Sequence, residues 1–345
     1  MLSPYKKDIL NALKLGFLPI ERLEGKSVLL TGATGLIGGA VGDMILEGCP
    51  GARLTVTGRS AERLRKRFPS TKVDILELDL SKEAPKKAFD FIIHAAGYAN
   101  PALYATSPVE VMTLNYNSLV PLLEAVRKNP GSRLLYVSSD EVYGETGLQT
   151  IEESDSGYVD CTRPRSCYPS SKRHCETLCA AYADEYGADV VTVRPSHVYG
   201  PYFTEGDNRA YAQFLRNVLN GEDVILKSQG EQMRSWCYSV DCASAILAVL
   251  LGGAKGEAYN IADNTSSFTI RDLAEMTAKA GGRSVGFDLP PELEKKGYNP
   301  VRRSVISTKK LESLGWKPVP GTPETKIAST YCTQKNYSLN GNTKP

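Results

Sequence analysis

Long apolar runs, an excess of one charge sign and clustered metal ligands are all missing from this sequence of 345 residues. No stretch reaches the roughly 18 apolar residues that a membrane-spanning helix needs, and residues 1–26 lack the apolar core of a signal peptide. The formal net charge is +2, from 41 basic and 39 acidic side chains, which is too balanced for a protein whose main partner is nucleic acid. We therefore expect a cytoplasmic protein that neither enters a membrane nor binds nucleic acid.

The eight cysteines and three histidines are spread along the chain rather than grouped. The cysteines form no C-x-x-C pair, and their spacing suits neither a zinc site nor a compact disulfide framework. Free thiols in a reducing compartment are therefore the expected state. Because the histidines are scattered as well, we expect no metal cofactor.

The sequence does contain an alternation of short apolar strands and helical stretches. Strands are expected at 27–30, 53–57, 73–78, 91–94, 134–137 and 190–193. Helical segments that separate them include 36–47, 108–128 and 169–186. Strands that alternate with helices form a parallel sheet covered on both faces. The sequence thus predicts an α/β fold, a Rossmann-type doubly wound parallel sheet with a smaller C-terminal α/β lobe.

The same pattern divides the chain into expected parts. They are a helical lead at 1–24, a Rossmann domain at 25–200 to which 236–263 returns, a smaller lobe at 201–235 and 264–321, and a tail at 322–345. The lobe is placed over the C-terminal ends of the strands, where open parallel sheets bind ligands. The tail is rich in Thr, Asn and Lys, a composition that predicts disorder.

A glycine-rich turn follows the first strand and opens a helix. Its sequence is Thr31-Gly32-Ala33-Thr34-Gly35-Leu36-Ile37-Gly38. The glycines permit a tight turn and let backbone N–H groups approach a pyrophosphate at the helix N-terminus. In this strand–turn–helix context the pattern predicts binding of NAD or NADP.

The end of the second strand bears on the choice between these two cofactors. NAD sites usually place Asp or Glu there to bind the ribose 2′-hydroxyl, whereas an arginine accommodates a 2′-phosphate. This chain has Arg59 and no acid at that point. If Arg59 faces the ligand, it favours NADP. If it is a solvated surface charge, it does not distinguish the two cofactors, so the sequence is compatible with both NAD and NADP.

Two further groups of side chains carry acid–base chemistry. Ser139, Asp140 and Glu141 crowd the end of the fifth strand, where the ligand should lie, although such residues also cap turns. Tyr168 and Lys172 are four residues apart and share one helix face. A phenol has a pKa of about 10, and a neighbouring ammonium together with an oxidised nicotinamide ring favours the phenolate.

Taken in this order, the four motifs resemble the extended short-chain dehydrogenase/reductase family, in particular the NAD-dependent epimerase/dehydratase group that remodels nucleotide sugars. The resemblance covers roughly residues 25–320. It implies that Tyr168 takes the proton of a sugar hydroxyl, that Ser139 binds the same oxygen, and that Lys172 holds the cofactor ribose. It also implies a homodimer formed through 108–128 and 169–186.

The resemblance assigns further residues to ligand binding. The implied cofactor contacts, besides the glycine-rich turn and Arg59, are Asp79, Leu80, Ala95, Ala96, Gly97, Asn115, Tyr168, Lys172 and Pro195. The implied substrate contacts are Tyr98, His197, Arg209 and Arg234, the last of which would bind the substrate pyrophosphate. His197 departs from the family, because many members have an asparagine there.

The members of this family share an oxidation of the sugar, usually at C4, and differ in how the resulting ketone reacts. Asp140-Glu141 resembles the acid–base pair of sugar 4,6-dehydratases, whereas 98–104, 164–168 and 207–209 resemble UDP-glucuronate decarboxylases. We rank decarboxylation first, 4,6-dehydration second and 4-epimerisation third. A dinucleotide-binding sensor without catalysis is the remote alternative, since fold alone never establishes function.

Overall fold

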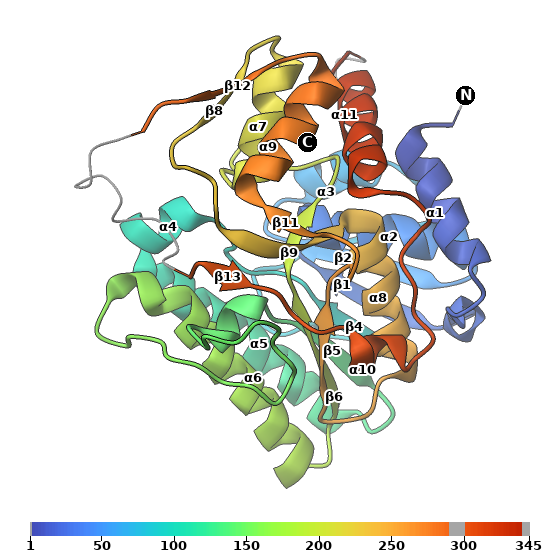
Figure 1. Ribbon diagram of the computed structural model, residues 1–345. Helices are drawn as coiled ribbons and strands as arrows, with labels where there is room; N and C mark the ends of the chain where they lie inside the picture. Colours follow the sequence, from blue (N-terminus) through green and yellow to red (C-terminus); the bar gives the residue numbers. More distant parts are fainter. Residues whose placement is uncertain (1, 290–300, 340–345) are drawn as a thin grey trace.

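A seven-stranded parallel sheet forms the centre of the computed structural model, which describes residues 2–289 and 301–339 (Figure 1). The strand order is β3-β2-β1-β4-β5-β6-β10. The strands are β1 (Ser27–Thr31), β2 (Arg53–Gly58), β3 (Asp74–Glu77), β4 (Phe91–His94), β5 (Arg133–Val137), β6 (Asp189–Pro195) and β10 (Ala258–Ile261). The six strands expected from the sequence are all present, so the predicted Rossmann-type sheet is confirmed.

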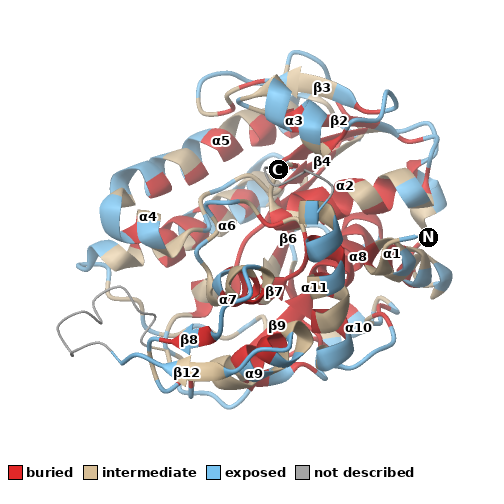
Figure 2. Ribbon diagram, turned by 90° about the horizontal axis from the view of Figure 1, so that it is seen from above, coloured by how far each residue is buried: buried red, intermediate tan, exposed pale blue. Residues whose placement is uncertain are grey.

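Helices cover both faces of this sheet because its strands are apolar on both sides. On one face, Val28 and Leu30 of β1 pack in a core shared with α2 (Leu36–Gly48) and α8 (Ser239–Gly252). On the other face, Leu29 packs in a core shared with α5 (Pro108–Lys128) and α6 (Cys167–Glu185). Figure 2, viewed from above, shows these buried layers.

The remaining elements lie at the edges of the sheet and in a smaller lobe. The edge and connecting helices are α1 (Pro4–Lys14), η1 (Ile20–Leu23), α3 (Ala61–Arg67), α4 (Pro101–Thr106), η2 (Asp140–Tyr143), η3 (Pro164–Ser166) and α10 (Lys309–Glu312). The lobe contains β7 (His197–Tyr199), α7 (Ala210–Leu219), β8 (Val224–Leu226), β9 (Met233–Tyr238), β11 (Ser267–Thr269), α9 (Ile270–Gly281), β12 (Val285–Phe287) and β13 (Arg303–Ser304). No helix within the described ranges is both long and apolar enough to cross a membrane.

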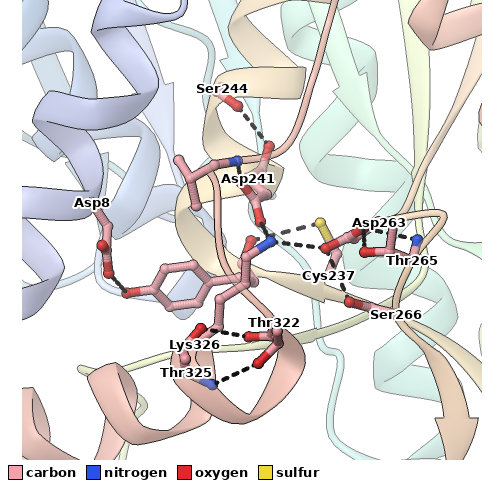
Figure 3. Close-up of polar contacts among 12 residues, drawn as sticks. Asp8, Cys237, Asp241, Ser244, Asp263, Thr265, Ser266, Thr322, Thr325 and Lys326 are labelled. Carbon is pink, nitrogen blue, oxygen red and sulfur yellow. Dashed lines mark hydrogen bonds and ion pairs between the residues drawn. The ribbon is translucent and has the colours of Figure 1, made fainter.

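The C-terminal segment corrects one expectation. Residues Pro323–Leu339 form helix α11, so the prediction of a disordered tail at 322–345 is wrong for this helix, and 340–345 lie outside the described residues. The buried ammonium of Lys326 pairs with Asp241 and Asp263, at 2.8 Å from each (Figure 3). The polar composition of the tail concealed this anchor, because the two aspartates lie more than 60 positions away in the sequence.

Candidate active site

A cleft of about 280 Å³ opens at the C-terminal ends of the strands. It lies where the strand order reverses between β1 and β4, the position at which such sheets bind ligands. Of the residues expected to bind a cofactor or substrate, it is lined by Gly32, Thr34, Gly35, Arg59, Asp79, Leu80, Ala95, Ala96, Gly97 and Tyr98. Sequence reasoning missed other lining residues, among them Ser60, Arg63, Leu114 and Ser118.

The other expected cofactor residues lie outside this lining. Leu36 and Ile37 begin α2 and pack on the core, and Pro195 is buried at the end of β6. Gly38 acts through close packing, because a Cβ added there would lie 2.3 Å from the Gly32 carbonyl oxygen. Gly32 itself has φ +66°, and an added Cβ would lie 2.5 Å from the Ala95 backbone. The turn is therefore held between α2 and the end of β4.

The residues of the cleft fit a dinucleotide. The N-cap residue of α2 is Gly35, which has no side chain with which to cap the helix, so the first backbone N–H groups are left for a phosphate. The amide of Asn115 donates to Ser171 Oγ at 2.9 Å, whereas its buried Oδ1 has no partner within the described residues. An added Cβ at Gly97 would lie 2.9 Å from that Oδ1. An orphaned acceptor beside an open glycine suits a donor on a bound ligand.

His94 organises the turn after β4, a role that the sequence did not reveal. Its ring lies 2.8 Å from Thr31 Oγ1 and 3.3 Å from Ser118 Oγ. Thr31 Oγ1 also accepts a hydrogen bond from the Ala96 amide at 3.0 Å. Burial and the nearby Lys172 charge lower the pKa of His94 to about 3. A neutral His94 therefore links β1 to the cofactor-lining turn.

Tyr168, Lys172 and Ser139 come together as the sequence predicts, and all three are buried. Lys172 Nζ donates to the Val137 carbonyl at 2.9 Å and lies 5.9 Å from the centre of the Tyr168 ring. Burial lowers the pKa of Lys172 to about 8. Burial, followed by the charge of Glu141, raises the pKa of Tyr168, and a hydrogen bond with Ser139 opposes this rise. The protein alone thus favours the phenol, and formation of the phenolate depends on positive charge supplied with the ligand.

Glu141 is held by an arginine that sequence reasoning did not connect with it. The Arg165 Nη1 and Nη2 atoms lie 3.2 Å and 3.3 Å from the two Glu141 carboxylate oxygens. The guanidinium of Arg165 also lies 4.8 Å from the centre of the Tyr104 ring. Tyr104 stacks on Tyr168, with ring centres 4.7 Å apart and an interplanar angle of 16°. Two sequence signals point to Arg165: its position three residues before Tyr168 and its place in the segment 164–168 that resembles the decarboxylases.

Asp140 lies at the junction with the smaller lobe. It accepts hydrogen bonds from Ser304 Oγ of β13 at 3.0 Å and from Ser139 Oγ at 3.3 Å. Burial raises the pKa of Asp140, and the charge of Arg234 opposes this rise. His197 Nδ1 is 3.6 Å from an Asp140 carboxylate oxygen, and burial together with Arg234 lowers the pKa of His197 to about 3. His197 is therefore neutral in the absence of a ligand.

The two expected substrate arginines approach this junction in different ways. Arg234 is buried on β9 and donates to the Met233 and Val301 carbonyls at 2.8 Å and 2.6 Å. Arg209 precedes α7 and pairs with Asp207 at 2.5 Å. Both guanidinium charges lower the pKa of His197, that of Arg234 opposes the rise at Asp140, and that of Arg209 lowers the pKa of Tyr168. By contrast, Tyr98 faces the dinucleotide end of the cleft, where its hydroxyl is 3.5 Å from Arg59.

Comparisons with known proteins agree with this geometry. The model of the NAD-dependent epimerase/dehydratase family matches residues 28–262. The chain is 29% identical to UDP-glucuronic acid decarboxylase 5 of Arabidopsis thaliana over 295 residues, 84% of each protein. It is also 29% identical to a dTDP-glucose 4,6-dehydratase of Streptomyces niveus over 307 residues, 84% of this chain and 88% of the other.

Solved structures are similar in fold. A UDP-N-acetylglucosamine 4-epimerase of Methanobrevibacter ruminantium superposes with a TM-score of 0.77 at 22% identity, covering 92% of this chain and 99% of that one. At this identity the likeness concerns the fold alone. It confirms the Rossmann-type architecture and leaves the reaction to the side chains of the site.

Proposed function

The chain belongs to the NAD-dependent epimerase/dehydratase family, and from that premise we propose that it modifies a nucleotide sugar by transient oxidation at C4, most simply as a UDP-glucuronate decarboxylase. The observation that carries the proposal is the buried group of Ser139, Tyr168 and Lys172 beside the dinucleotide cleft. The decarboxylase assignment is supported by the relatives that match 84% of the chain. It is also supported by Glu141, which is engaged by Arg165 rather than free to act as a base.

The proposed mechanism assigns one task to each side chain. Tyr168 removes the proton of the C4 hydroxyl and later returns it, while Ser139 binds the same oxygen. Lys172 holds the cofactor ribose and stabilises the phenolate. Arg234 and Arg209 bind the anionic diphosphate, for which a planar guanidinium is well suited. The bound dinucleotide supplies the hydride acceptor, and the 4-ketone that results weakens the bond from C5 to the carboxylate.

A panel of UDP-, dTDP-, GDP- and CDP-sugars tests this function by the mass of the product. Loss of CO₂ from UDP-glucuronate supports decarboxylation. Loss of water from a neutral hexose nucleotide indicates a 4,6-dehydratase, and an isomer of unchanged mass indicates a 4-epimerase. Tight dinucleotide binding without turnover of any sugar would favour the sensor.

Dehydration is the second candidate because of Asp140. Its burial favours the protonated acid that a dehydratase delivers to the departing C6 hydroxyl. A decarboxylase has no such leaving group, since a β-keto acid loses CO₂ with little help. The side chain of Asp140 therefore distinguishes the two reactions.

We expect Asp140→Asn to keep its activity on UDP-glucuronate within about fivefold of the wild type, because the amide preserves the shape and the contacts with Ser304 and Ser139. The measurement is the initial rate of CO₂ release. The control is Asp160→Asn, which removes the charge of an aspartate that caps an exposed turn. A loss of about 100-fold or more, with a ketosugar or reduced cofactor accumulating from a neutral hexose nucleotide, would favour the dehydratase.

We also propose that the cofactor choice leans toward NADP. Arg59, Ser60 and Arg63 line the cleft after β2, and residues 57–61 at the end of that strand include no Asp or Glu to bind a ribose 2′-hydroxyl. Two guanidinium groups and a hydroxyl provide a site for a 2′-phosphate. The family's usual mechanism with NAD remains compatible with the rest of the cleft.

If Arg59 contacts a 2′-phosphate, Arg59→Ala should weaken NADP binding by roughly 10–100-fold and NAD binding by less than about twofold, since a charge-assisted hydrogen bond contributes about 1.5–3 kcal/mol. Titration calorimetry with each oxidised dinucleotide measures both effects. Arg65→Ala, at an exposed position of the following helix α3, is the matched control. Equal effects on NAD and NADP would make Arg59 a surface charge.

We further propose a cytoplasmic homodimer. All eight cysteines are free thiols, which suits a reducing compartment. Helix α5, which packs on α6, exposes Val109, Met112 and Tyr116 at helical spacing, a stripe that a second copy could cover.

A further inference from the structure

Four side chains from four elements form a continuous cluster around the catalytic tyrosine. Glu141 of η2 pairs with Arg165 of η3, Arg165 lies over the ring of Tyr104 of α4, and Tyr104 stacks on Tyr168 of α6. Tyr104 and Tyr168 are buried, and the side chains of Arg165 and Glu141 are each 21% exposed. The ion pair is therefore shielded from water and is stronger than a pair on the surface.

The cluster connects the Glu141–Arg165 ion pair to the Tyr168 phenol, which must lose a proton in the proposed reaction. Burial raises the pKa of the Tyr168 phenol, and the charges of Glu141 and Asp140 raise it further. Ser139 and Arg209 lower it, and the Lys172 ammonium is 5.9 Å from the ring centre. Without a partner, the charge of Glu141 would oppose the phenolate at full strength. Arg165 is the cation that contacts Glu141.

The position of Arg165 is not explained by protein packing alone. Its Nε is buried and has no hydrogen-bond partner in the part of the chain that the structure describes. An unsatisfied buried donor destabilises the fold, and such groups call for an explanation. The orientation of the guanidinium instead satisfies Glu141 and the face of Tyr104.

We propose that Arg165 is a positioning residue for the catalytic tyrosine: it neutralises Glu141 and, through Tyr104, fixes the Tyr168 ring, so that the phenolate can form. The proposal rests on the proposed function, because it takes Tyr168 as the acid–base group. It also refines that function. A carboxylate held at both oxygens orients the sugar and is a poor base for the C5 proton, so the cluster favours decarboxylation over dehydration.

A charge cycle tests the proposal through the pH dependence of kcat/KM for the holoenzyme with UDP-glucuronate, or with whichever sugar of the panel is turned over. In Arg165→Met the unpaired carboxylate should move the acid limb up by about 0.5–1 pH unit. In Glu141→Gln the unpaired guanidinium should move it down. In the double variant the two shifts should cancel, leaving the limb within about 0.3 unit of the wild type.

Two further variants complete the design. Arg163→Met is the matched control, because Arg163 lies two residues away, is 76% exposed and pairs only with Asp160 among the described residues. Its acid limb should equal that of the wild type. Arg165→Lys keeps the charge without the planar fork, so its limb should shift less than that of Arg165→Met. If Arg165→Met does not fold, Arg165→Lys still tests the positioning role.

The outcomes separate this inference from the proposed function. An unchanged acid limb in both Arg165 variants, or shifts of the same sign in Arg165→Met and Glu141→Gln, overturns the positioning role, since loss of structure alone cannot give opposite shifts that cancel. Full activity of a Tyr168→Phe variant would instead overturn the acid–base assignment on which the proposed function depends.

Discussion

Tyr168→Phe should fold, bind its dinucleotide and lose about 10²–10⁴-fold in kcat, because general acid–base catalysis contributes an effect of that size. The substitution removes one oxygen and keeps the ring that stacks on Tyr104 at 4.7 Å. Dinucleotide affinity should therefore change by less than about twofold. The measurement is single-turnover formation of reduced nicotinamide, read by absorbance, alongside the mass of the sugar product.

The control for this prediction removes a phenol elsewhere on the same helix. Tyr182 of α6 donates to Glu124 at 2.8 Å, on the side of the helix that faces α5. Tyr182→Phe should lose a little stability and no catalysis. A Tyr168→Phe enzyme within a few-fold of the wild type would remove Tyr168 from the mechanism and return the phenol to a packing role.

The parts of the site that the sequence predicted are those that depend on local structure. The turn from Gly32 to Gly38 has a fixed spacing between a strand and a helix, and Tyr168 and Lys172 are one helical turn apart. Each of these patterns is complete within a few residues. Chain order alone then places them at the same edge of a parallel sheet, because all carboxyl ends of the strands meet there.

The parts that the sequence did not predict depend on contacts between distant segments. The pair of Arg165 with Glu141 and the contact of Ser304 with Asp140 join residues 24 and 164 positions apart. The same holds for α11, because Lys326 pairs with Asp241 and Asp263 only in the folded chain. Composition described the tail as polar, and it could not show that one of its charges is buried.

The second large effect concerns the glycine-rich turn, where Gly38→Ala should reduce dinucleotide affinity at least about 100-fold. The added Cβ would lie 2.3 Å from the Gly32 carbonyl oxygen, 2.8 Å from its carbon and 3.1 Å from the Ala33 Cα. All three are backbone atoms, so no side-chain rotation relieves the overlap. The turn cannot retreat either, because Gly32 already lies against the Ala95 backbone. The N–H groups that would cradle the pyrophosphate must therefore move.

The neighbouring glycine supplies the matched control for this prediction. A Cβ at Gly39 would lie 2.8 Å from the Arg67 guanidinium, which is paired with Asp43, and its three nearest atoms would all belong to that side chain rather than to the backbone of the turn. Gly39→Ala also gains about 1 kcal/mol of helix propensity, as Gly38→Ala does. Calorimetric titration with NAD and NADP, together with thermal unfolding, separates affinity from stability. Equal affinity of Gly38→Ala and Gly39→Ala for either dinucleotide would contradict this prediction. The close approach of α2 to the turn would then not shape the phosphate site, and the cofactor would be held mainly by the turns after β2 and β4.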